Sequence, residues 1–160
     1  MSTQPRSVTG RQLLTFKLGA EVFGVDILRV REIRGWSPVT RIPQTEAYML
    51  GMLNLRGSVV PVIDLRLKFE LACAEYNALT VIIVLSVGGP DASQEVGLVV
   101  DAVSEVLDVP ADAVHEASEI GDGITPHISG LLTLDQGMVI LLDADRLAAS
   151  PAPSIHHEAA

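Results

Sequence analysis

Side chains that could hold a metal or act as a nucleophile are few, and their spacing fits neither role. The four histidines are His115, His127, His156 and His157. No two of them stand at the i, i+4 helical spacing of a zinc protease, and with Cys73 as the only cysteine a Cys-x-x-Cys pair is excluded. The chain also lacks a Gly-x-Ser-x-Gly elbow and a glycine-rich phosphate loop. We therefore expect no metal, no cofactor, no catalytic residue and no enzymatic activity.

The remaining candidates for polar chemistry are a carboxylate pair and a set of arginines. Asp143 and Asp145 stand at the start of a predicted helix, where capping and the helix dipole account for them. The arginines are Arg29, Arg31, Arg34 and Arg56. Single-stranded nucleic-acid binding would require exposed aromatic side chains between such cations. Aromatic residues make up only 4% of the chain, and Trp36 is the one expected to be partly exposed. A protein-docking surface fits better, and a nucleic-acid-binding small β-barrel is the alternative.

The charge of the chain is unevenly distributed. Its net charge is −9, yet residues 1–70 carry ten Lys or Arg against six Asp or Glu, whereas residues 71–160 carry one against fourteen. Opposite potentials could face different partners, or the asymmetry could be chance placement of solvated charge. The acidic total disfavours nucleic acid as the partner.

Length and hydropathy predict a single folded domain. The 160 residues are 48% hydrophobic, with a mean hydropathy of +0.37. Apolar runs such as Val81–Val87 fall far short of the roughly 20 residues that cross a bilayer, and residues 1–10 do not form a secretory signal. A single cysteine fits a reducing compartment. We expect a cytoplasmic domain over residues 12–148, with flexible tails at 1–11 and 149–160.

Short alternating apolar patterns predict a mainly β fold. Leu14–Leu18 and Phe23–Ile27 flank Gly19-Ala20, which predicts a hairpin whose turn has glycine first. The other predicted strands are Val30–Arg34, Val59–Ile63, Val81–Val87, Val96–Val100, Val103–Leu107 and Met138–Leu142. Short helices are predicted at Thr45–Leu50, Asp64–Phe69 and Asp143–Ala149, the last two capped by their first residue.

An internal repeat indicates two similar units. Gly24–Ile33 aligns without gaps on Gly97–Val106, and Gly51–Asp64 aligns on Gly130–Asp143. The repeat predicts two small barrels, over roughly 12–70 and 79–148, because a closed barrel leaves no exposed sheet edge.

Several motifs of this chain resemble the bacterial chemotaxis coupling protein family, CheW. They are Phe16-Lys17-Leu18-Gly19, Gly24-Val25-Asp26-Ile27, Val30–Arg34, Asn54-Leu55-Arg56-Gly57, Val60–Arg66 and Gly97–Asp101. The resemblance runs from about residue 12 to 148. It implies two SH3-like five-stranded β-barrels with short helices and a non-enzymatic adaptor function. It further implies a cytoplasmic protein, recruited to membrane-associated receptor arrays, that couples transmembrane chemoreceptors to the CheA histidine kinase.

The same resemblance implies the partner-binding residues. The cytoplasmic tip of a methyl-accepting chemoreceptor, a helical hairpin, would lie in the groove between the barrels, and the regulatory domain of CheA would contact the barrel ends. The implied receptor-binding residues are Val30, Glu32, Gly51, Asn54, Leu55, Arg56, Val81 and Val106. Val30 and Val106 could face each other across that groove or be ordinary core residues, and Glu32 and Arg56 would supply oriented polar contacts.

Overall fold

Strands make up most of the chain in the computed structural model, as the sequence predicts. It describes residues 11–149 except 42, 44–46, 70, 72–75, 89–93, 111–112, 117–126 and 136. The strands are β1 (Arg11–Leu18), β2 (Glu21–Asp26), β3 (Val30–Gly35), β4 (Met49–Leu55), β5 (Ser58–Asp64), β6 (Val81–Val87), β7 (Gln94–Val100), β8 (Ala102–Val109), β9 (Val114–Glu116), β10 (Ile128–Leu134) and β11 (Gly137–Leu142). The short helices are η1 (Ile27–Arg29), α2 (Leu65–Lys68) and α4 (Ala144–Ala149).

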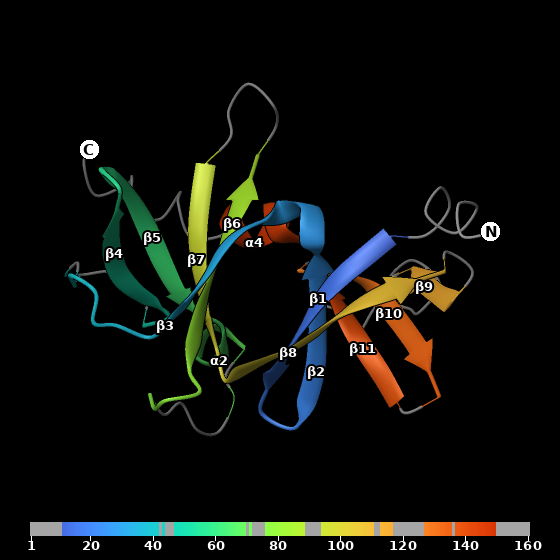
Figure 1. Cartoon of the computed structure of the whole chain (residues 1–160). Coiled ribbons are helices and arrows are strands. Elements are labelled where there is room, and N and C mark those ends of the chain that lie inside the picture. Colours follow the sequence, from blue (N-terminus) through green and yellow to red (C-terminus); the bar gives the residue numbers. More distant parts are fainter. Residues whose placement is uncertain are drawn as a thin grey trace.

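The strands form two sheets that lie side by side (Figure 1). One has six strands in the order β8-β1-β2-β11-β10-β9, and the other has five in the order β3-β6-β7-β5-β4. The resemblance implies five strands in each barrel, so the six-stranded sheet has one more than expected. The extra strand, β9, pairs through only three residues with β10, and in the five-stranded sheet an isolated bridge between Thr40 and Met52 takes the corresponding place.

The two sheets do not coincide with the two halves of the sequence, so the expected assignment of one barrel to each half, 12–70 and 79–148, is wrong. The third strand of each half is exchanged, because β3 pairs with β6 and β8 pairs with β1. The five-stranded sheet is therefore built from the continuous segment Val30–Val100, and the six-stranded sheet from what precedes and follows it.

The repeat itself is visible in the strand pairing. The parallel pair Val62↔Gly97 joins β5 to β7, and the parallel pair Leu141↔Gly24 joins β11 to β2. The two pairs correspond in the sequence repeat, because Val62 and Leu141 are 79 residues apart and Gly24 and Gly97 are 73 residues apart, the two offsets of the repeat. The hairpins β4–β5 and β10–β11 correspond in the same way, and each has a register shift next to its glycine, Gly51 or Gly130.

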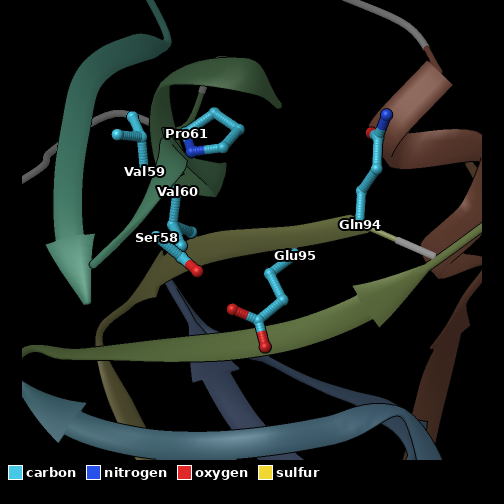
Figure 2. A pocket seen from close by; sticks show the side chains of 6 residues that line it. All are labelled: Ser58, Val59, Val60, Pro61, Gln94 and Glu95. Carbon is cyan, nitrogen blue, oxygen red and sulfur yellow. The ribbon is translucent and has the colours of Figure 1, made fainter. Parts of the chain in front are cut away.

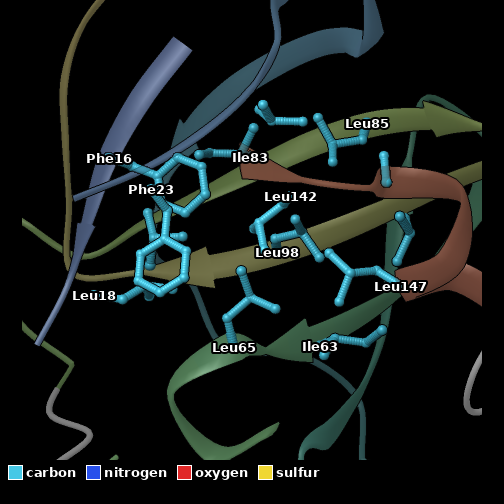
Figure 3. Packing of buried hydrophobic residues seen from close by; sticks show 14 of the residues in the cluster. Phe16, Leu18, Phe23, Ile63, Leu65, Ile83, Leu85, Leu98, Leu142 and Leu147 are labelled. Carbon is cyan, nitrogen blue, oxygen red and sulfur yellow. The ribbon is translucent and has the colours of Figure 1, made fainter. Parts of the chain in front are cut away.

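Each sheet buries side chains on both of its faces, which explains the continuous apolar runs. Along β6, Ile83 and Leu85 lie in a central cluster between the sheets, whereas Ile82 and Val84 belong to a second cluster inside the five-stranded sheet. Phe16 of β1 enters the central cluster from the other sheet (Figure 3). A period-two pattern is hidden when both faces are apolar.

The predicted turn and caps are confirmed, and one predicted helix is wrong. Gly19 has φ 61° at the first position of the β1–β2 turn, and the Asp64 side chain accepts a hydrogen bond from the Arg66 N–H at the start of α2. The helix predicted over Thr45–Leu50 is contradicted where the chain is described, because Met49 and Leu50 begin β4.

Several other expectations fall at the edge of the described chain or beyond it. Arg11, expected in a flexible tail, is the first residue of β1 and pairs with Val109. Ala149, also assigned to a tail, is the last residue of α4. Cys73, His156 and His157 lie outside the described residues.

Candidate functional site

The turn between β4 and β5 presents an arginine in an unusual backbone conformation. Arg56 has φ 50° and Gly57 has φ 88°, so this two-residue loop has left-handed backbone at both positions. Such a turn matches the twist of the flanking strands. The Asn54 side-chain oxygen accepts a hydrogen bond from Gly57 N–H at 3.1 Å, which holds the loop. The Arg56 side chain is 70% exposed and projects from a fixed base.

An ion pair connects this turn to the opposite edge of the sheet. Arg56 Nη1 lies 3.0 Å from Glu32 Oε1, and Arg34 Nη1 lies 3.3 Å from Glu32 Oε2. Glu32 is on β3 and Arg56 follows β4, and these are the two edge strands of the five-stranded sheet. The curvature of the sheet therefore brings its edges together, and Glu32, Asn54 and Arg56 form one polar surface.

Gly51 and Leu55 lie beneath the surface of this hairpin, Leu55 next to the turn and Gly51 toward the other end. A Cβ atom at Gly51 would stand 2.0 Å from the Thr40 carbonyl oxygen, so only glycine lets the Thr40 segment cross β4 there. Leu55 is 3% exposed in the cluster inside the five-stranded sheet. Any effect of these two residues on a partner is therefore exerted through the shape of the hairpin.

Val30 and Val81 stand at opposite ends of one strand pair. Val30 is opposite Leu85, and Val81 is opposite Gly35, along the β3–β6 ladder. Both valines are half-buried and pack against the central cluster. The structure thus places Val30 close to Glu32 along β3 and Val81 at the far end.

Val106 lies in the other sheet, on the edge strand β8, opposite Leu14 of β1. It is 48% exposed, so it is not an ordinary core valine. Its counterpart in the sequence repeat is Ile33 on the edge strand β3, which is 44% exposed. Sequence reasoning missed Ile33. The signal for its exposure was present, because the charged Glu32 and Arg34 occupy the inward positions of β3 that apolar residues normally take and so leave Ile33 facing outward.

A buried charge cluster beside α2 was also missed. The Arg66 side chain is 1% exposed and donates to Asp64 at 2.9 Å and to Asp101 at 2.8 Å. Tyr76 donates its hydroxyl to Asp64 at 2.6 Å and stacks on Trp36, with ring centroids 4.3 Å apart. Trp36 packs against this cluster and is partly exposed, as expected.

The pKa values of Arg66 and Tyr76 are raised, which keeps both groups protonated and able to donate to Asp64. Burial lowers the pKa of Arg66, but the hydrogen bonds to Asp64 and Asp101 outweigh it, and the net change is upward. Burial and the hydrogen bond to Asp64 raise the pKa of Tyr76 to about 12. Arg66 is therefore a permanent cation that neutralises the buried carboxylate of Asp64.

A cleft opens directly after the Arg56-Gly57 turn, where β5 and β7 diverge (Figure 2). It measures about 660 Å³ and is lined by Ser58, Val59, Val60, Pro61, Gln94 and Glu95. The two strands pair only from Val62 onward, whereas in the other sheet the pairing already starts at Val139, the counterpart of Val60. Pro61 stands between Val60 and Val62. Because proline has no N–H to donate to the strand ladder, β5 and β7 separate at this position.

Two findings bear on other functions. Among the described residues there is no group of three or more side chains that could hold a metal ion. In the same part of the chain, none of the helices is both long enough and apolar enough to pass through a membrane.

Comparison with known proteins gives one consistent result. The CheW-like domain family matches residues 12–152. The chain is 44% identical over 142 residues to the chemotaxis protein CheW of Klebsiella aerogenes, covering 88% of this chain and 83% of that relative. It is 41% identical over 138 residues to a probable chemotaxis protein CheW of Rhizobium etli, covering 86% of each.

A solved structure agrees with these sequence matches. The crystal structure of the scaffolding protein TtCheW from Thermoanaerobacter tengcongensis superposes with a TM-score of 0.76 at 29% identity. The match covers 86% of this chain and 91% of that one. The shared arrangement of strands therefore extends over nearly the whole of both chains.

Proposed function

The chain belongs to the CheW family of chemotaxis scaffolding proteins, and we propose that it couples the cytoplasmic tips of methyl-accepting chemoreceptors to the CheA histidine kinase. Proteins of this family are adaptors rather than enzymes, so its contribution is geometric. Holding receptor and kinase together raises their effective concentration and lets a change in one alter the other.

The observation that carries the receptor side of the proposal is the polar surface of Glu32, Asn54 and Arg56. Its ion pair and turn fix the direction of a long cationic side chain before any partner arrives. A preorganised charge at the rim of an interface sets register and association rate. The aliphatic side chains of Val30 and Ile33 on the same strand supply apolar area for one face of a receptor helix.

The remaining receptor residues take indirect or separate roles in this proposal. Gly51 lets the Thr40 segment cross β4, Leu55 packs beneath the turn, and Val81 supports the far end of β3. Val106 adds an exposed aliphatic side chain from the second sheet. A helical hairpin that contacts both edge strands, β3 and β8, would use Ile33 and Val106 together.

The kinase side of the proposal rests on family membership. The regulatory domain of CheA would dock on the ends of the sheets, away from β3. Coupling through a bound receptor would also place the chain in the cytoplasm, recruited to receptor arrays at the membrane. A role in single-stranded nucleic-acid binding, the alternative from composition, gains nothing from Trp36, because its ring stacks on Tyr76.

The test is a titration of the purified chain against a receptor-tip fragment and against the regulatory domain of CheA. Arg56→Ala should weaken receptor binding about fivefold, because an exposed charge contributes roughly 1 kcal/mol to binding. It should leave kinase binding unchanged. The matched control is Asp135→Ala, which removes a charge from the corresponding turn of the other sheet. Equal receptor affinity of wild type and Arg56→Ala removes Arg56 from the site.

A further inference from the structure

The two sheets are joined by two ion pairs, and one partner of each, Arg66 or Asp145, stands at the same position of the repeat. In the first, Arg66 on α2 donates to Asp101 Oδ1 at 2.8 Å, and Asp101 Oδ2 accepts the N–H of Gly19 at 2.7 Å. Arg66 follows β5 of the five-stranded sheet, and Asp101 links β7 of that sheet to β8 of the six-stranded sheet. Gly19 is in the β1–β2 turn of the six-stranded sheet. The Asp101 carboxylate therefore connects α2, next to the five-stranded sheet, to a hairpin of the six-stranded sheet.

The second ion pair connects residues next to the six-stranded sheet to the backbone of the five-stranded sheet. Arg29 of η1 donates from Nη1 and Nη2 to the two carboxylate oxygens of Asp145 on α4, at 3.1 and 2.8 Å. Asp145 Oδ1 also accepts the N–H of Gly88 at 2.9 Å, at the end of β6 in the five-stranded sheet, and Arg29 reaches the carbonyl of Ser86 at 3.2 Å. Figure 1 shows α4 behind the connection from β2 to β3, close to β6.

The polarity of the two pairs is reversed. The 79-residue offset of the repeat places Asp145 at the position of Arg66, each in the helix that follows the last strand of its hairpin. Their partners are not at the same repeat position, because the 73-residue offset places Ala102 at the position of Arg29, but Arg29 and Asp101 both lie in the connection after a central strand, β2 or β7. In each case an arginine and a carboxylate join helix to strand end, and the carboxylate also binds a backbone N–H of the opposite sheet.

The two pairs differ in solvent exposure. Arg66 is 1% exposed, whereas Arg29 and Asp145 are 35% and 45% exposed. An exposed pair is weaker and more easily broken than a buried one. Arg29 also stands directly before Val30, the first residue of β3. The weaker pair is therefore the one attached to the strand that carries Glu32.

We propose that Arg29 and Asp145 are positioning residues for coupling: their ion pair fixes the angle between the two sheets and so the direction in which β3 presents its receptor-binding surface. This inference rests on the proposed function for its consequence and on the contacts above for its geometry. Breaking the pair leaves each partner surface intact but changes how the two surfaces are oriented relative to each other.

The experiment has a structural readout on the full-length chain alone. Residual dipolar couplings of backbone amides give the relative orientation of the two sheets in wild type, Arg29→Ala and the double swap Arg29→Asp/Asp145→Arg. The swap recreates the polarity already used by Arg66 and Asp101. The control is Arg31→Ala, because Arg31 also points to Ser86 but reaches its hydroxyl only at 3.5 Å.

We expect Arg29→Ala to change the angle between the sheets, the swap to restore it at least in part, and Arg31→Ala to leave it unchanged. In assemblies with receptor fragment and kinase, Arg29→Ala should lower kinase activation about fivefold or more while each binary affinity stays the same. An unchanged angle in Arg29→Ala overturns the positioning role, and so does full activation despite an altered angle.

Failure of the proposed function gives a different pattern. If the wild-type chain binds neither receptor nor kinase, coupling is refuted, yet the dipolar couplings still decide whether Arg29 and Asp145 set the angle. A lower melting temperature in Arg29→Ala with an unchanged angle identifies the pair as a stabilising contact only.

Discussion

Replacing Gly51 by alanine tests whether this receptor-site residue acts through the fold or by contact. The added Cβ would stand 2.0 Å from the Thr40 carbonyl oxygen and 2.7 Å from its carbonyl carbon. Both are backbone atoms, so no side chain can rotate away. The Thr40 segment must therefore leave β4, and the bridge between Thr40 and Met52 must break.

The cost follows from what is lost. The bridge contains two backbone hydrogen bonds, Thr40 N–H to Met52 at 3.0 Å and Met52 N–H to Thr40 at 2.8 Å. Each contributes about 1 kcal/mol net. Gly51 also has φ 154°, where a residue with a side chain adds strain of about 1–3 kcal/mol. The expected loss is about 3–5 kcal/mol, a large part of the stability of a domain this size.

Urea unfolding followed by circular dichroism measures this loss. Gly35→Ala is the control, because Gly35 is an exposed strand glycine with nothing within 4 Å of an added Cβ, and its stability should stay within about 0.5 kcal/mol of wild type. Wild-type stability of Gly51→Ala refutes the close crossing. Wild-type stability combined with lost receptor binding makes Gly51 a direct contact.

The remaining predictions concern the turn, the buried cluster and the exposed valine. Arg56→Gly should change the unfolding free energy by less than about 1 kcal/mol, because relief of left-handed backbone strain offsets the lost ion pair with Glu32 and the greater freedom of glycine in the unfolded chain. It should still weaken receptor binding, and a loss of stability of more than about 2 kcal/mol contradicts this. Arg66→Met should destabilise by about 3–5 kcal/mol, because it leaves Asp64 buried without its cation, and near-wild-type melting would show that water reaches the cluster. The pKa of Tyr76, raised to about 12, means that its neutral form adds stability below pH about 10, and that this stability is lost as the pH rises through about 12. Tyr76→Phe should remove that alkaline step from the unfolding free energy measured against pH, and an unchanged profile assigns it to another group. Val106→Asp should melt close to wild type, because Val106 is 48% exposed, and should weaken receptor binding; strong destabilisation would place Val106 in the interior.

Local features of the fold were predictable because they depend on neighbouring residues. The β1–β2 turn needs a glycine at its first position, and the start of α2 needs a capping side chain. Gly19 and Asp64 meet these needs in the structure. The strands β4 and β10 were missed for a shared reason. Each carries a central glycine, Gly51 or Gly130, that interrupts the apolar pattern and marks the place where another segment crosses.

Long-range features were beyond the sequence pattern. The exchange of β3 and β8 between the sheets depends on pairing between distant segments, and the repeat is equally compatible with unexchanged barrels. In the candidate site, Glu32 and Arg56 were predicted as polar contacts, but their ion pair requires the edges of the sheet to meet. The pairing of Arg66 with Asp101 spans 35 residues and left no local signal.

The most direct test of the coupling function is receptor control of kinase autophosphorylation, reconstituted with membrane-embedded receptor and CheA, with and without this chain. The proposed function predicts that receptor ligand changes the rate of autophosphorylation only when the chain is present, and that Arg56→Ala requires a higher concentration to give the same control. Ligand control that is equally strong without the chain, or no control at any concentration of it, would contradict the proposed function.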